Sequence, residues 1–101
     1  MTIKHRENVT LRIKRIYLDA IRAGDKKHEF RSANEHYSKM LFPVPKTLTL
    51  HYQNPNDKIC VAVKKITRIK APKELLAKGF FGDSTHLYKI HLGRKLWDTK
   101  K

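Results

Sequence analysis

Apolar and polar residues alternate along four short segments of the chain, and this pattern predicts four strands. The segments are 9–13, 27–31, 47–52 and 85–92. Successive side chains of a strand point to opposite faces, so the alternation is typical of strands with one buried face. A fifth strand is predicted at 59–69, and the turn-forming residues Asn54-Pro55-Asn56-Asp57 before it indicate a hairpin with 47–52.

Between the first two strands, apolar residues recur at the spacing of a helix. Their intervals of three, four, seven and eight residues make one stripe, formed by Ile13, Ile16, Tyr17, Ala20 and Ile21. Arg22 supplies a basic last turn and Gly24 a left-handed cap, which together mark the end of a helix. The stripe predicts the main helix of the fold.

The remaining elements are short. Pro72 and Gly79 bracket a predicted helix over 73–78, and 35–41 is predicted to be a loop with helical turns. No glycine-rich phosphate loop occurs in the sequence, which disfavours a nucleotide-binding α/β sheet. We therefore expect an α+β fold, a small mixed or antiparallel β-barrel of about five short strands with one main helix and one or two short ones.

Length and cysteine content favour a single cytoplasmic domain spanning 1–101. A chain of 101 residues has the size of one domain, and it contains one cysteine, Cys60, in the apolar run 59–63. A buried thiol is expected there, and a disulfide framework is excluded. The N-terminus lacks the apolar stretch of a signal peptide, and no window has the length of a membrane span.

The C-terminal segment 94–101 is predicted to be a basic extension of this domain. It contains the sole tryptophan, Trp97, which is either docked on the body or available for stacking. Because tryptophan buries a large area when it meets a groove, we favour the docked arrangement.

The charge of the chain predicts an anionic partner. Lysine and arginine number 23 against nine acidic residues, a formal net charge of +14, and the basic residues are interleaved with apolar ones. The charge therefore belongs to the folded surface, and a nucleic acid is the expected partner. An acidic protein is the alternative, while no basic segment has the apolar face of a membrane-surface helix.

The most informative motif follows the main helix. It reads Gly24-Asp25-Lys26-Lys27-His28-Glu29-Phe30-Arg31. Lys26 and Lys27 offer point charges, and the planar guanidinium of Arg31 can bind a phosphate through two hydrogen bonds while Glu29 holds it in position. The alternative interpretation is a solvated strand face on which the Glu29–Arg31 pair provides local charge balance.

At these residues the chain resembles the ASCH domain family, a group of PUA-like small β-barrels. The family motif Gly-x-Lys-x-x-Glu-x-Arg is matched by Gly24, Lys26, Glu29 and Arg31, directly after a strand and an amphipathic helix. The resemblance extends to the first strand, the middle hairpin and the last strand. It implies a PUA-like barrel with a charged cleft beside the motif, used by family members to bind RNA and, in some, to hydrolyse RNA or nucleoside substrates.

The resemblance also defines an alternative function. Members that deacetylate acetylated cytidine use a threonine where this chain has Glu29, and a carboxylate does not replace an activated alcohol in acyl transfer. Lys26 and Glu29 remain suited to act as general acid and base on a ribose hydroxyl. The main hypothesis is thus a non-catalytic RNA-binding module, and the alternative is a small hydrolase acting on RNA or a modified nucleoside.

Other residues extend the predicted interface. The second half of the long strand carries Lys64, Lys65, Arg68 and Lys70, which either contact phosphates or protect an edge strand from aggregation. Tyr37, in a polar stretch, is the aromatic residue expected to be exposed for base stacking. The six histidines are scattered and have no cysteine partners, so neither a metal nor another cofactor is expected.

Overall fold

The computed structural model describes residues 7–53, 56–79, 81 and 84–99, so part of the predicted 54–57 turn lies outside the described residues. Helices and strands follow the order β1 (Asn8–Arg12), α1 (Arg15–Arg22), β2 (His28–Ser32), α2 (Glu35–Leu41), β3 (Thr47–His51), β4 (Lys58–Lys70), α3 (Lys73–Ala77) and β5 (His86–Asp98). None of the helices in these residues combines the length and apolarity needed to cross a bilayer.

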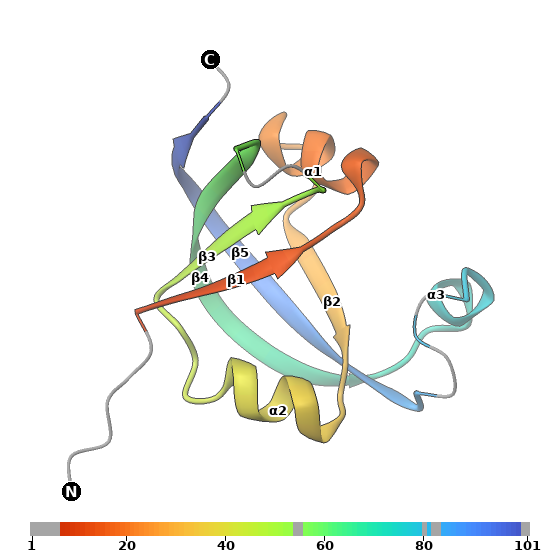
Figure 1. Cartoon of the computed structure of the whole chain (residues 1–101). Helices are drawn as coiled ribbons and strands as arrows, with labels where there is room; N and C mark the ends of the chain where they lie inside the picture. Colours follow the sequence, from red (N-terminus) through yellow and green to blue (C-terminus); the bar gives the residue numbers. More distant parts are fainter. Residues whose placement is uncertain (1–6, 54–55, 80, 82–83, 100–101) are drawn as a thin grey trace, which may run out of the picture.

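The strands form one curled, mixed sheet with the order β1-β3-β4-β5-β2. β1 runs parallel to β3, and the other neighbours are antiparallel. Figure 1 shows α1 at one end of the curled sheet, α2 at the opposite end, and α3 beyond the ends of β4 and β5. Within the described residues, the fold is thus α+β, a five-stranded half-barrel with three helices, which is compatible with the predicted small barrel.

The core lies inside the curled sheet, under α1 and α2. Alternation along β1 buries Val9 and Leu11, as the sequence pattern predicts. The most completely buried large side chains are Leu18, Leu41, Leu48, Leu50, Ile59, Leu87 and Ile90. Burial of each such side chain contributes about 1.5–3 kcal/mol. The Cys60 thiol is buried and free, as expected for a small hydrophobic residue.

The end of α1 is predicted correctly, whereas its buried face is predicted only in part, since Ile21 is buried and Tyr17 packs against the core. Gly24 has a φ of 85°, so it provides the left-handed cap. Ile16, however, is 70% exposed, and Leu18 is fully buried in its place. The helix begins only at Arg15, so Ile13 belongs to the preceding segment and does not fix the helical face. The face on the core is set by Leu18 and Ile21, three residues apart.

The last strand is longer than the sequence pattern predicts. β5 continues to Asp98, and Lys95, Trp97 and Asp98 pair with β4 instead of leaving the sheet. Trp97 is 45% exposed, so it is not buried in a groove as expected. The Lys58 ammonium lies 5.9 Å from the centroid of its ring, which is a cation–π contact.

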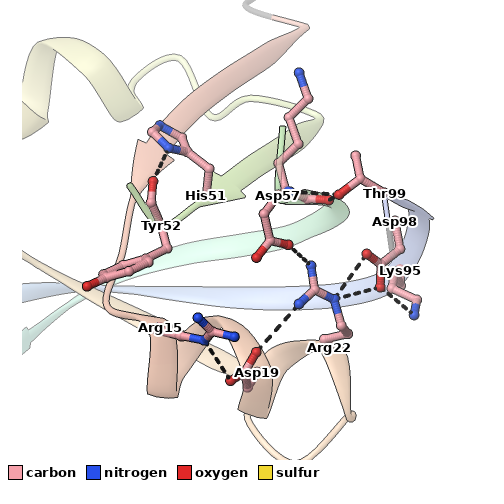
Figure 2. A network of polar contacts seen from close by, with 10 residues as sticks. Arg15, Asp19, Arg22, His51, Tyr52, Asp57, Lys95, Asp98 and Thr99 are labelled. Atoms are coloured by element: carbon pink, nitrogen blue, oxygen red, sulfur yellow. Dashed lines mark hydrogen bonds and ion pairs between the residues drawn. The ribbon is translucent and has the colours of Figure 1, made fainter. Parts of the chain in front are cut away.

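Arg22 connects the end of α1 to both long strands (Figure 2). Its Nε donates to the Asp98 carboxylate at 2.9 and 3.0 Å, and its Nη2 donates to Asp57 at 2.6 Å. Only 16% of the Arg22 side chain is exposed, against 54% for the third partner, Asp19. Burial alone would lower the pKa of Arg22, but the hydrogen bonds to Asp98 and Asp57 raise it. The guanidinium is therefore a structural cation.

Replacing Arg22 by leucine is expected to destabilise the fold by about 3 kcal/mol, because two largely buried carboxylates lose their guanidinium. Asp19→Asn is the matched control, and it should cost less than about 1 kcal/mol because Asp19 is exposed. Urea unfolding followed by circular dichroism measures both changes. Equal losses for the two variants would contradict this account of the network.

Candidate nucleic-acid interface

A cavity opens along the seam between the two edge strands of the sheet. β1 and β2 stand at opposite ends of the strand order, and no ladder joins them in the described part of the chain. The cavity has a volume of about 620 Å³, and its walls include residues 10–14, residues 29–32 and Tyr17 of α1. His36, Tyr37 and Met40 of α2 cover one end. We call this space the seam cavity.

Arg31 crosses the seam from β2 to β1. Its Nη2 donates to the backbone carbonyl of Arg12 at 2.9 Å, and its Nη1 donates to the Tyr37 hydroxyl at 3.4 Å. Arg31 lines the seam cavity although only 16% of its side chain is exposed. The face of β2 that carries Arg31 therefore points into the seam and not into bulk solvent.

The charge of Arg31 is incompletely neutralised. Its carboxylate partner, Glu29, lies 3.5 Å from Nη2, which is the limit of a hydrogen bond. The Nε atom of Arg31 is buried and has no hydrogen-bond partner among the described residues. Because a buried cation needs a close counter-charge, this guanidinium favours an anion in the adjoining cavity.

Glu29 contributes less to holding Arg31 than the sequence suggests. The residue is 6% exposed, and its Oε1 accepts a hydrogen bond from the Phe30 N–H at 2.9 Å. One carboxylate oxygen is thus committed to the backbone of β2, and only the other faces Arg31. The tighter constraint on the guanidinium is the carbonyl of Arg12.

Lys26 lies at the border of the seam cavity. Its ammonium is 5.2 Å from the Tyr17 ring centroid and 5.5 Å from that of Phe30, and both rings line the cavity. Burial lowers the pKa of Lys26, while the charge of Glu29 partly raises it. Lys27 is exposed and does not line the seam cavity; it lies in a second hollow, described below.

Aromatic rings make up much of the cavity wall. Tyr37, predicted to be an exposed stacking residue, is half-buried, and the Arg31 guanidinium carbon lies 5.7 Å from its ring centroid. Tyr17, Tyr52 and Phe81 line the same space. The sequence interpretation assigned Tyr17 to the apolar stripe of the main helix. No sequence signal shows that these rings, far apart in the chain, face one cavity.

The basic residues of β4 lie elsewhere. Lys64, Lys65, Arg68 and Lys70 are all exposed, and none lines the seam cavity. Arg12 and Lys14, which the sequence interpretation did not select, do line it. The structure thus gathers Glu29, Arg31 and Tyr37 at the seam, with Lys26 at its border and the β4 cations outside it.

Two histidines meet on the outer surface of β2 and β5. The rings of His28 and His91 are 4.9 Å apart in an edge arrangement, and His91 Nε2 lies 3.1 Å from the Thr67 hydroxyl. Burial lowers the pKa of both histidines, and the neighbouring charge of Lys89 lowers it further, as does that of Lys65 for His91. Among the described residues, no group of three or more His, Cys, Asp or Glu side chains has the arrangement of a metal site.

The lowered pKa values of His28 and His91 predict that the folded protein loses stability in mild acid. With a folded-state pKa below the ordinary 6.5, each binds its proton more readily in the unfolded chain, so stability falls as the pH drops below about 6.5. His91→Gln should reduce the difference in Tm between pH 7.5 and pH 5, measured by thermal unfolding. His36→Gln on α2 is the matched control. An unchanged difference in the His91 variant would contradict the assignment.

Comparisons with known proteins identify no relative. No protein-family model, no curated protein and no solved structure matches the chain. Functional inference therefore rests on the geometry of the seam and on the charge around it.

Proposed function

We propose that this protein is an RNA-binding module of the ASCH, PUA-like kind, and that it holds a single-stranded segment of RNA at the seam. A base enters the seam cavity, and the flanking phosphates lie near Arg31 and Lys26. The observation that carries the proposal is the incompletely neutralised guanidinium of Arg31 in a cavity walled by aromatic rings.

The size and lining of the cavity support a nucleobase as the occupant. Its volume of about 620 Å³ lies within the range of small-ligand sites. Tyr17, Tyr37 and Tyr52 offer ring faces, and stacking of one base on an aromatic ring contributes about 1–3 kcal/mol. A base reaches such a cavity only when it is unpaired, so single-stranded RNA is the expected form.

The charge supports a polyanion. A net charge of +14 on a folded surface favours phosphate binding through release of condensed counterions. Three cations, Arg12, Lys14 and Arg31, line the cavity against one carboxylate, Glu29. An acidic protein would use the same charges but not an aromatic cavity, which favours RNA between the two.

The first test is the salt dependence of RNA binding. Affinity for a fluorescent single-stranded 12-nucleotide RNA, measured by anisotropy, should fall steeply between 50 and 200 mM salt because each phosphate contact adds about 0.7 to the log–log slope. Arg31→Gln should weaken binding at least about tenfold, the effect of losing one charge-assisted contact. An affinity that ignores salt would overturn the proposal.

Because Arg31 also connects β1 to β2, its replacement can change the fold as well as the binding. A second variant that leaves the fold intact is therefore needed. Arg12→Gln changes an exposed side chain of the same cavity, and it should reduce affinity without lowering Tm. Lys39→Gln is the matched control, since Lys39 is 75% exposed and does not line the cavity. Equal effects of Arg12→Gln and Lys39→Gln would show that binding does not use the seam.

A second candidate function is RNA hydrolysis by Lys26 and Glu29. It is favoured by one observation: burial lowers the pKa of Lys26, and the buried carboxylate of Glu29 acts on the same ammonium. A partly buried lysine near a carboxylate is suited to proton transfer. The hydrogen bond from Phe30 N–H to Glu29 leaves one carboxylate oxygen for that role.

The two functions are separated by incubating the purified protein with end-labelled RNA and with modified nucleosides. If Lys26 and Glu29 are catalytic, product appears with the wild-type protein, and Glu29→Gln abolishes it by removing the base. Binding without product, measured on the same RNA, would eliminate the hydrolase and leave the binding module.

A further inference from the structure

A second concave surface lies between the end of α1 and the two long strands. It has a volume of about 510 Å³, and we call it the strand hollow. Six cations line it, namely Arg22, Lys26, Lys27, Lys64, Arg94 and Lys95. None of the described residues that line it is acidic. Such an excess of one sign in a concavity concentrates anions.

Two of the six charges are already compensated by ion pairs, and three others are not. Arg22 is neutralised by Asp57 and Asp98, and Lys95 lies 3.2 Å from Asp98. Lys27, Lys64 and Arg94 are exposed, and they form no ion pair with a described residue. These three side chains are the ones available to a ligand.

The hollow arises from irregular pairing between β4 and β5. The partner of Val61 is Lys95, that of Val63 is Leu92 and that of Lys65 is His91, so the register shifts on both sides of Val63. In a regular strand, neighbouring side chains point to opposite faces. Here four consecutive residues, 92–95, line the same hollow. Lys64, which lies at the register shift between Val63 and Lys65, lines it as well. Bulges of this kind redirect side chains towards functional sites.

Gly93 lies where the two strands approach each other closely. A Cβ atom at this position would lie 3.1 Å from the Cβ of Ala62, which is tighter than most packed contacts. A glycine next to Arg94 therefore suits the close approach of the irregular segment to β4.

Lys26 joins the strand hollow to the seam cavity. It lines the hollow, while its ammonium lies over the rings of Tyr17 and Phe30, which line the cavity. We infer that the strand hollow binds the phosphodiester backbone of the same RNA strand, next to the nucleotide held at the seam. Lys26 then stands between the two binding places, and Lys64 and Arg94 contact the further phosphates. The inference rests on the proposed RNA-binding function.

The test combines two charge removals with two lengths of RNA. The double variant Lys64→Gln/Arg94→Gln should bind a single-stranded 12-nucleotide RNA at least about tenfold more weakly than the wild type. Its log–log salt slope should be shallower by about 1.4, which is 0.7 for each lost phosphate contact. Binding of a dinucleotide, which reaches the seam alone, should be unchanged.

The matched control is Lys39→Gln/Lys73→Gln, which removes the same charge from two exposed residues that line neither concavity. If this control changes the slope as much as the double variant does, the strand hollow has no specific role and the inference is overturned. If wild-type protein binds no RNA, the proposed function itself fails. If Arg31→Gln and Arg12→Gln weaken binding while the double variant does not, only the strand hollow is rejected.

Lys64 and Arg94 are both exposed, so we expect glutamine at either position to leave the fold intact, and circular dichroism at the assay temperature checks this. Lys64→Gln alone provides a second readout, with a slope shallower by about 0.7. A single variant with the wild-type slope would contradict a phosphate contact at Lys64.

Discussion

Arg12 belongs to β1, an edge strand of the sheet, and its backbone carbonyl accepts a hydrogen bond from the guanidinium of Arg31 at 2.9 Å. The Arg31 side chain thus supplies a hydrogen bond to this carbonyl that a neighbouring strand would supply in a closed barrel. Because an arginine spans more distance than a backbone hydrogen bond, β1 and β2 remain apart, and the seam cavity occupies the space between them. The interaction that ties the sheet edges together is also the one that places a cation in the site.

Arg22 provides the matching constraint at the end of α1. Three of the nine acidic residues, Asp19, Asp57 and Asp98, surround it, and two of these hold the helix against the ends of β4 and β5. Acidic side chains are therefore concentrated on a structural arginine. Lys27, Lys64 and Arg94 of the strand hollow form no ion pair with a described residue, so one small fold combines a stable framework with a strongly basic surface.

Much of the fold can be predicted from the sequence because local rules decide it. Strand alternation locates β1, β2, β3 and the first half of β5, and the left-handed conformation at Gly24 follows from the lack of a side chain. The exposure of Ile16 and the length of β5 depend on tertiary pairing, which periodicity does not specify. The site was predictable in part: Glu29 and Arg31 share a strand face by alternation, but that this face meets Tyr37 and Arg12 across a seam depends on the curl of the sheet. The strand hollow depends on register shifts between β4 and β5, which no pattern of residues in the sequence predicts.

The two adjacent lysines of the motif both precede β2 and differ in their surroundings. Strand pairing begins at His28, and the carbonyl of Lys27 already accepts a hydrogen bond from the Leu92 N–H at 2.9 Å. Lys27 is thereby fixed beside β5 and lines the strand hollow, whereas Glu29 and Arg31 turn into the seam. Lys26, one residue earlier, lies between the two concavities. In the proposed binding mode, an RNA strand that follows these charges passes over Lys26, which lines the strand hollow and borders the seam cavity.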